Sequence, residues 1–247
     1  MTPIKSRTVL IKHLIVKFHI ISFVICIPLL VVSSTVTWAI NDIGLYQKGF
    51  DKYHISLKTG ISSEDLTNVG GEIQKYFNSL EEPLSVTTEI FGEERILFNN
   101  REVTHMRDVK KLIHLVYSVM IISGAYVICM ITWSCISGPI FRFYIRPTII
   151  IYGCGLTILS VVSLGILSLM GFDEIFVIFH KMSFGNDLWI LDPRTDYLIM
   201  LFPLGFWFDI TMKIAIISVI TSLAITAASF CAQIIASAKN KGRKSSK

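Results

Sequence analysis

Four long runs of the chain contain no charged side chain. They are Phe18–Ile40, with 23 residues, and Leu112–Ile136, Thr148–Phe172 and Ile214–Ala238, with 25 residues each. A helix rises 1.5 Å per residue, so about 20 apolar residues cross the hydrocarbon core of a bilayer. The pattern therefore predicts an all-α membrane protein with transmembrane helices at 18–40, 112–136, 148–172 and 214–238.

A fifth apolar stretch, Tyr197–Phe208, has only 12 residues and contains Pro203. It is too short to span, and a proline interrupts helical hydrogen bonding. We expect it to be interfacial or re-entrant, within an outer segment at 173–213.

Composition agrees with a membrane protein. Hydrophobic residues make up 52% of the chain and charged residues only 17%, whereas soluble domains carry about 25% charged residues. A soluble enzyme, a disordered regulator and a secreted disulfide scaffold are therefore excluded. All five cysteines fall in or beside the predicted spans, so we expect no disulfide framework in the outer segments: Cys26, Cys129, Cys135, Cys154 and Cys231.

The distribution of charge predicts the orientation. The segments 1–17, 137–147 and 239–247 together hold eleven basic residues and no acidic one, while the rest of the chain holds 12 bases and all 18 acids. The positive-inside rule then places both termini and the 137–147 loop in the cytoplasm, and 41–111 and 173–213 outside. Nothing in this balance points to nucleic acid, and the basic tail suits anionic lipid headgroups.

The first span is expected to be an uncleaved signal anchor. Its basic flank resembles a secretory signal, but a 23-residue apolar run is longer than the usual hydrophobic region of a signal peptide.

The first outer segment, 41–111, contains signals for a small α-rich or α+β cap. Ser62 and Asp65 have capping-box-like spacing, and Leu66, Val69, Ile73 and Tyr76 follow at helical spacing. Alternation over 84–98 favours a short hairpin. From Arg101 to Ile136 nothing interrupts a helix, so the second span should begin with two or three turns above the bilayer.

The second outer segment, 173–213, is less regular. Asp173–Met182 is expected to form an interfacial helical turn, with four apolar side chains entering the lipid or the bundle: Ile175, Phe176, Ile178 and Phe179. Ser183–Asn186 should form a turn. Asp192–Pro193 is typical of a helix start, and that helix would carry Asp196 and end near Pro203.

Candidate chemistry lies in these outer segments. Glu102, His105 and Asp108 are three residues apart on neighbouring turns of one helix face, so a carboxylate could hold the imidazole in one tautomer. His180 lies in the other outer segment, before four polar or acidic residues: Asn186, Asp187, Asp192 and Asp196. Because histidine titrates near neutral pH, two such residues at one membrane surface suit acid and base catalysis.

Other interpretations compete with this one. Either histidine taken alone is more often a surface or packing residue. Glu102-x-x-His105 is half of a di-iron signature, but a complete site needs a second copy, so neither a metal nor a cofactor is expected. The chain lacks a His-x-x-x-x-Asp motif, a Gly-x-Ser-x-Gly motif and a nucleotide-binding glycine loop. Charge-free spans give transport little support.

Two stretches resemble the lipoprotein intramolecular transacylase (Lit) family of four-span bacterial membrane proteins. The first is Phe98–Lys110, which opens the second span and contains His105. The second outer segment agrees through several short motifs: Phe179-His180, Asn186-Asp187-Leu188-Trp189, Leu191-Asp192-Pro193, Asp196, Leu198-Ile199, Pro203 and Phe206–Asp209. Gly60-Ile61-Ser62 is also similar. Leu204 departs from the pattern, where many relatives have a polar or acidic residue.

The resemblance implies an O-to-N acyltransferase that needs no covalent intermediate or cofactor. Such enzymes move the sn-2 acyl chain of a diacylglyceryl-modified lipoprotein onto the α-amine of its N-terminal cysteine, giving a lyso-form lipoprotein. His105 and His180 would be catalytic, and which of them is base and which is acid stays open. Orienting or substrate-binding roles fall to six further residues: Glu102, Asp108, Asn186, Asp187, Trp189 and Asp196.

The implied partners are diacylglyceryl lipoproteins and membrane lipids, at the outer leaflet of a bacterial plasma membrane. The alternative is a non-enzymatic accessory membrane protein that binds an outer-leaflet lipid or a partner protein through 41–111. Because both histidines are expected at the water-facing ends of their elements, alanine at either position should leave the fold intact.

Overall fold

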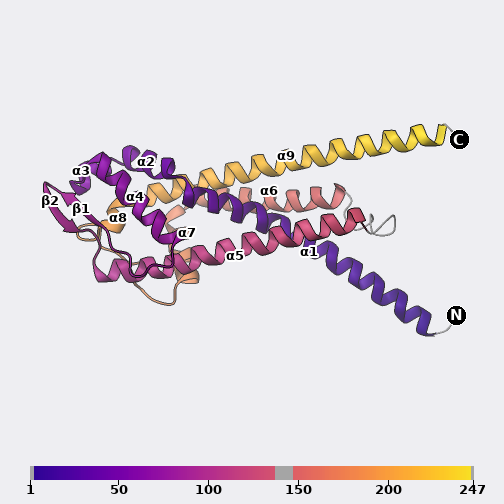
Figure 1. Ribbon diagram of the computed structural model, residues 1–247, viewed down its shortest axis with the longest axis horizontal. Helices are drawn as coiled ribbons and strands as arrows, with labels where there is room; N and C mark the ends of the chain where they lie inside the picture. The colour runs from indigo at the N-terminus through magenta and orange to yellow at the C-terminus, as the bar shows by residue number, and fades with distance from the viewer. Residues whose placement is uncertain (1–2, 137–146, 246–247) are drawn as a thin grey trace. The chain divides into compact units, whose positions relative to one another are not determined.

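The computed structural model describes residues 3–136 and 147–245, and most of this part of the chain is helical. Within it, four helices are long and apolar enough to cross a membrane: α1 (Pro3–Asn41), α5 (Asn100–Ile136), α6 (Pro147–Met170) and α9 (Leu204–Ser245) (Figure 1). This confirms the four predicted spans and the unbroken helix from Arg101 to Ile136. The expected loop at 137–147 lies outside the described residues, apart from its last residue.

The chain folds as two compact units. Among the described residues, the first comprises 3–34, 119–136, 147–163 and 215–245, and the second comprises 35–118 and 164–214. In the first unit, Phe23 and Ile27 of α1 pack with Cys154 of α6 in an apolar cluster. Gly153 allows this approach, because a Cβ atom there would lie 2.4 Å from the Cδ1 atom of Ile27.

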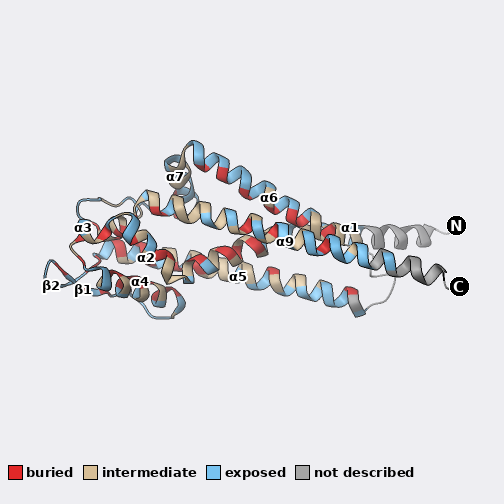
Figure 2. Ribbon diagram, turned by 90° about the horizontal axis from the view of Figure 1, so that it is seen from above, coloured by how far each residue is buried: buried red, intermediate tan, exposed pale blue. Residues whose placement is uncertain are grey.

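Large apolar side chains are exposed along the span helices. Ile121 of α5, Leu159 of α6 and Ile220 of α9 are each more than half exposed, and Figure 2 shows exposed residues recurring along all three helices. Water-soluble proteins rarely expose so much contiguous apolar surface. These faces are therefore suited to contact with lipid.

The second unit contains the remaining elements and the larger core. Its helices are α2 (Ile43–Lys52), α3 (Ile55–Thr59), α4 (Ser63–Asn78), α7 (Phe172–Ser183) and α8 (Tyr197–Leu201), and its antiparallel hairpin is β1 (Thr87–Ile90) with β2 (Glu93–Ile96). Ile55, Ile61, Leu66, Ile73 and Leu201 are its most completely buried apolar side chains. The cap is thus α-rich with one short hairpin, as the alternation over 84–98 predicted.

Local signals begin α4 and close the hairpin. The Ser62 hydroxyl accepts a hydrogen bond from the backbone N–H of Asp65 at 3.0 Å and donates one to the Asp65 carboxylate at 2.7 Å, which confirms the predicted helix start. In the hairpin, Phe91 and Gly92 both have positive φ, 52° and 86°. Glycine adopts this geometry without steric cost, and two such residues form a tight two-residue turn between strands.

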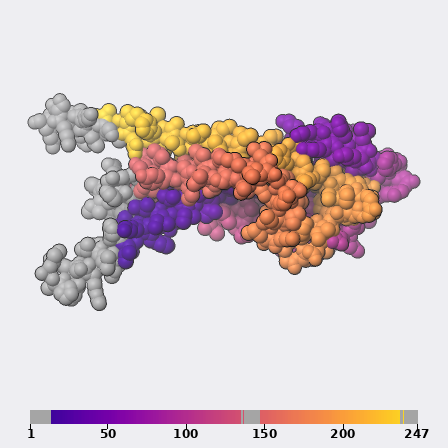
Figure 3. Space-filling model, turned by 180° about the vertical axis from the view of Figure 1, so that it is seen from behind, coloured from indigo at the N-terminus to yellow at the C-terminus, as the bar shows by residue number. Residues whose placement is uncertain are grey.

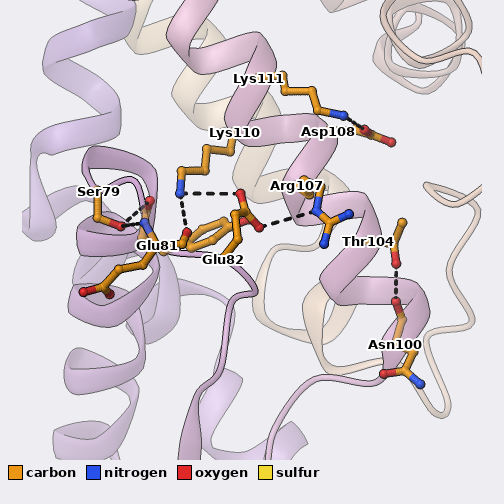
Figure 4. Close-up of polar contacts among 10 residues, drawn as sticks. Ser79, Glu81, Glu82, Asn100, Thr104, Arg107, Asp108, Lys110 and Lys111 are labelled. Atoms are coloured by element: carbon orange, nitrogen blue, oxygen red, sulfur yellow. Dashed lines mark hydrogen bonds and ion pairs between the residues drawn. The ribbon is translucent and has the colours of Figure 1, made fainter.

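An ion-pair network ties the loop after α4 to α5. The Glu82 carboxylate lies 3.5 Å from Lys110 Nζ and 3.5 Å from Arg107 Nε, and it accepts a hydrogen bond from the Tyr76 hydroxyl at 2.8 Å. Lys110 is 5% exposed and also donates to the Glu81 carbonyl at 2.6 Å. Figure 4 shows Arg107 and Lys110 pointing towards Glu82, so this side of α5 fixes the cap.

The structure corrects one expectation for the second outer segment. Asp192–Pro193 does not start a helix: Asp192 Oδ1 accepts from the backbone N–H of Arg194 at 3.0 Å, which makes a turn, and α8 begins only at Tyr197. The end of a helix near Pro203 is as expected, because α8 ends at Leu201, and the 197–208 stretch is divided between two helices. Pro203, which cannot donate a backbone hydrogen bond, separates α8 from α9, and residues 204–208 form the first turn of α9.

Candidate functional site

The fold brings His105 of α5 and His180 of α7 together, although 75 positions separate them in the sequence. Their ring centroids lie 6.2 Å apart, with 33° between the ring planes. Both side chains are buried, with relative exposures of 6% and 7%. The convergence expected from sequence is therefore present, but the expectation of water-facing histidines is wrong, because aromatic side chains cover both rings.

A backbone carbonyl determines the tautomer of His180. Its Nδ1 lies 2.7 Å from the carbonyl oxygen of Phe176, one turn earlier in α7. A carbonyl only accepts hydrogen bonds, so Nδ1 carries the proton and Nε2 of the neutral ring keeps its lone pair. Burial disfavours the charged ring and lowers the pKa of His180 below its usual 6.5. His180 is thus a neutral imidazole with a basic Nε2.

His105 interacts with the Asp108 carboxylate through charge and not through a hydrogen bond from Nδ1. Its Nδ1 is buried and makes no hydrogen bond. Asp108 was expected to orient this ring, but its carboxylate instead accepts from Lys111 Nζ and from Asn186 Nδ2, each at 2.9 Å. In Figure 4, Asp108 and Lys111 point away from the Glu82 network. Asp108 therefore ties a loop to α5 by hydrogen bonds, while its negative charge still acts on the nearby imidazole.

Glu102 is the most deeply buried acidic side chain that the described residues contain, at 1% exposure. Its Oε2 accepts from the backbone N–H of Asn99 at 2.8 Å, while Asn99 Oδ1 accepts from the Glu102 N–H at 3.1 Å. This reciprocal pair is a capping box at the start of α5. The other oxygen, Oε1, accepts from the N–H of Leu198 at 2.7 Å, so Glu102 caps α5 and α8 together.

Asp196 continues the same buried network. It occupies the N-cap position of α8 without a side-chain bond to that helix. Its carboxylate instead accepts from Asn99 Nδ2 at 3.0 Å and from the backbone N–H of Asp192 at 2.8 Å. Glu102 and Asp196 therefore hold the second outer segment against the start of α5, and both act at a distance from the histidine rings.

The loop that follows α7 lies against α5 on the His105 side. Asn186 reaches Asp108, as described above, and Arg101 Nη2 donates to the backbone carbonyl of Asp187 at 2.6 Å. For Asp187, the contact to α5 therefore comes from the backbone carbonyl and not from the carboxylate. Arg101 was not predicted as a site residue, since its partner is 86 positions away.

Aromatic rings enclose the two histidines. The Phe184 ring lies edge-on to His105 at 5.0 Å between centroids and 5.6 Å from His180. Trp189 lies 5.0 Å and Phe176 4.2 Å from His180. Trp189 was expected at the site, whereas Phe184 had been read only as part of a turn. Its burial at 9% exposure is the feature that marks it, and sequence alone does not show that burial.

The chemistry of the pair is proton transfer in a largely apolar enclosure. Two imidazoles can accept and deliver protons near neutral pH. Within the described residues, no group of three or more histidine, cysteine, aspartate or glutamate side chains is placed to hold a metal ion. The carboxylates that sequence placed near His105 are instead engaged by backbone N–H groups, Lys111 and Asn186.

Four long apolar helices and a buried pair of histidines define a membrane-integral protein with a candidate site suited to acid and base chemistry. Comparison with known proteins identifies the family. The model of the lipoprotein intramolecular transacylase Lit family matches residues 21–207, so the chain belongs to that family of membrane acyltransferases.

Solved structures share the fold. The membrane-integral lipoprotein intramolecular transacylase Lit from Bacillus cereus superimposes with a TM-score of 0.72 at 16% identity, covering 92% of this chain and 98% of that one. A variant of the same protein with a histidine-to-arginine substitution gives a TM-score of 0.75 at 15% identity over 96% of this chain and 99% of that one.

A curated relative has no assigned function. An uncharacterized protein of Aquifex aeolicus is 31% identical over 129 residues, which is 52% of this chain. The match spans 54% of that protein, so the chain covers about half the length of this relative.

Proposed function

We propose that this protein moves the sn-2 acyl chain of a diacylglyceryl lipoprotein to the α-amine of the lipoprotein's N-terminal cysteine. The observation that carries the proposal is the buried pair of His105 and His180, with ring centroids 6.2 Å apart. This spacing suits two groups that act on one ester. Membership of the lipoprotein intramolecular transacylase family supports a lipoprotein substrate.

In the proposed reaction, the substrate amine is the nucleophile. Its nitrogen attacks the sn-2 carbonyl carbon, the ester C–O bond then breaks, and the proton lost by nitrogen is balanced by one gained by the glyceryl oxygen. An ester becomes an amide, so the transfer requires no energy source. An α-amine has a pKa of about 7.7–8.0, so a modest base suffices to remove its proton.

The geometry supports distinct duties for the two rings. Because Nδ1 of His180 donates to Phe176, its Nε2 is the basic atom and takes the amine proton. The neutral His105 ring then relays this proton from His180 to the leaving glyceryl oxygen, so that both rings are neutral again when the transfer is complete. No serine or cysteine nucleophile is needed. Glu102 and Asp196 hold the start of α5 and the 192–198 segment together through their hydrogen bonds.

We place the site at the outer leaflet of a bacterial plasma membrane, with both termini in the cytoplasm. The charge distribution of the sequence supports this orientation, and α7 supports the depth. At 100° per residue, Phe172, Phe176 and His180 share one side of α7. Ile178, Phe179 and Met182 lie on another side and are 55%, 48% and 83% exposed.

The side of α7 that is exposed carries apolar side chains. Orange atoms, which include those of α7, lie at the surface of the molecule in Figure 3. A helix with one exposed apolar side and charged residues such as Asp173 and Lys181 elsewhere is typical of a membrane interface. Such a position sets His180 at the level of the ester linkages of an outer-leaflet lipid anchor.

The test is the chemical form of a lipoprotein N-terminus made in cells with and without this protein. Mass spectrometry should find the N-acyl, lyso-glyceryl form only with the protein present. His105→Ala and His180→Ala should each lower conversion about 10²–10⁴-fold, the usual contribution of a general acid or base. Conversion should persist with a chelator, because the proposed chemistry uses two imidazoles.

The matched control is His54→Asn. His54 is exposed and has a φ of 53°, a conformation that asparagine tolerates. Alanine at the buried positions 105 and 180 leaves a cavity, so the melting temperature of each variant is measured alongside activity. Folded histidine variants with full conversion would contradict the proposal. An unchanged lipoprotein with and without the protein would favour the accessory binding role.

A further inference from the structure

The loop of residues 184–190, called the strap here, is fastened to α5 on both sides of His105. Arg101, His105 and Asp108 share one face of α5, because they are four and three residues apart. Asn186 Nδ2 donates to Asp108 Oδ2 at 2.9 Å, and Arg101 Nη2 donates to the Asp187 carbonyl at 2.6 Å. The strap therefore crosses the helix at the position of the histidine.

The first residue of the strap covers the histidine pair. Phe184 is 9% exposed, and its ring centroid lies 5.0 Å from that of His105 and 5.6 Å from that of His180. Beneath it, the unpartnered Nδ1 of His105 is buried. A buried polar atom without a partner is costly, which indicates that a ligand group completes the site when the cover is moved.

The strap is held differently from the other walls of the site. His105 and His180 lie on α5 and α7, whose backbone bonds fix them. The strap has no regular secondary structure, and its residues Gly185, Asn186 and Asp187 are exposed. Within the described part of the chain, the two side-chain hydrogen bonds above and the ring contact of Phe184 with His105 join it to α5. It is the part of the enclosure that can move at the smallest loss of bonding.

The strap also has hydrogen bonds of its own. The backbone N–H of Leu188 bonds to Asn186 Oδ1 at 3.1 Å, and the N–H of Ile190 bonds to the Asp187 carbonyl at 3.2 Å. Its two ends are anchored separately: the Phe184 N–H bonds to the His180 carbonyl at the end of α7, and the turn at Asp192 is held by Asp196.

We infer that the strap is a lid over the histidine pair, and that Asp108 and Asn186 are positioning residues that latch it. The inference rests on the proposed function for its substrate, a diacylglyceryl peptide, whose sn-2 ester cannot reach the buried rings while Phe184 covers them. The lid opens to admit the ester and closes to exclude water. Asp108 therefore acts through the strap, without touching the reacting atoms.

The first test tethers the latch. Cysteines replace Asp108 and Asn186 in a protein whose native cysteines are changed to alanine, and a short bis-methanethiosulfonate reagent joins them reversibly. The tethered enzyme should lose at least tenfold in conversion of a diacylglyceryl lipopeptide, and a reductant should restore it. A tethered enzyme that converts substrate at the untethered rate would overturn the lid.

The second test needs no turnover, so a failure of the lid is distinguishable from a failure of the proposed function. Diethylpyrocarbonate modifies accessible imidazoles, and peptide mass spectrometry reports each site. Asn186→Ala removes the bond to Asp108 and the bond that Asn186 Oδ1 accepts from the Leu188 N–H, which should raise the modification rate of His105 about fivefold while that of His54 stays constant. An unchanged His105 rate would refute the latch.

Two further variants distinguish loss of the bond between Asp108 and Asn186 from a general destabilisation of this region. Lys111→Ala removes the other partner of Asp108 and leaves the bond to Asn186, so the His105 rate should not change. Exchange of the two groups in the double variant Asp108→Asn with Asn186→Asp restores a donor and an acceptor, and should return the rate to the wild-type value. If the exchange fails to rescue while Asn186→Ala accelerates modification, Asp108 is not the latch.

Discussion

Replacement of Glu102 by alanine should destabilise the outer cap and reduce activity only as a consequence. In the structure its carboxylate accepts two backbone N–H groups, from Asn99 at 2.8 Å and from Leu198 at 2.7 Å, and the side chain is 1% exposed. Alanine removes both acceptors and leaves the donors without partners. It also removes half of the capping box that begins α5.

The magnitude follows from those two donors. A buried donor that loses its partner costs about 1–3 kcal/mol, so two of them cost about 2–6 kcal/mol in the free energy of unfolding. For a chain of this size, 1 kcal/mol shifts the melting temperature by about 2–4 °C. Glu102→Ala should therefore melt roughly 5–20 °C below the wild type.

The assay is thermal unfolding of the detergent-solubilised protein, followed by tryptophan fluorescence and paired with conversion of a lipopeptide well below both melting temperatures. Glu64→Ala is the control, because Glu64 is an exposed glutamate in the first turn of α4. We expect the control to melt with the wild type and Glu102→Ala to retain conversion in the cold. A variant that melts normally and is inactive at every temperature would refute the structural role and assign Glu102 to the chemistry.

Two other predictions follow from the titration of His180 and from the charge distribution. Burial lowers the pKa of His180 below 6.5, so the contribution of the neutral ring to stability is complete above about pH 6.5 and is lost as the pH falls through the pKa of the folded state. The melting temperature of the wild type should therefore fall more steeply below pH 6.5 than that of His180→Phe. Parallel curves of melting temperature against pH would contradict this. The membrane orientation is tested with single cysteines placed in a protein without native cysteines. Cysteines at Asn99 and Ser183 should react with an impermeant maleimide in intact cells, and a cysteine at Ser245 should not. Labelling at Ser245 would contradict the proposed orientation.

Most of the fold could be predicted from sequence, because its signals are local. A charge-free run of 25 residues identifies a span whatever surrounds it, and the hydroxyl of Ser62 finds its partner only three positions away. The hairpin likewise depends on neighbouring residues and a two-residue turn. These elements are specified within a few turns or strands, so the pattern along the chain suffices.

The same local reasoning was wrong at Asp192–Pro193. An aspartate before a proline is compatible with both a helix start and a turn, because in each the carboxylate accepts a nearby backbone N–H. What decides between them is Asp196, whose carboxylate takes the N–H of Asp192 and the side chain of Asn99. Asn99 lies 97 positions away from Asp196, and no local pattern contains that information.

At the candidate site, the sequence indicated which residues to consider but not which partners they bind. His105 and His180 could be chosen as candidates because histidine chemistry is explicit in the sequence, and the charge distribution predicts an outer location for them. The roles of the acids could not be assigned, since Glu102 bonds to Leu198 and Asp108 to Asn186 across large sequence separations. Phe184 was missed because an aromatic residue in a turn carries no sign of which side chain it will cover.

The burial of the histidines bears on the choice between acyl transfer and hydrolysis. An activated ester beside a general base will react with water if water reaches it, and the acyl chain is then lost as a fatty acid. Rings that are 6% and 7% exposed beneath Phe184 leave little room for water beside the ester. Water exclusion also favours the neutral form of His180, which is the form that accepts a proton. One apolar cover over two imidazoles thus serves both requirements of the proposed transfer, because it keeps the base neutral and leaves the substrate's own amine as the available nucleophile.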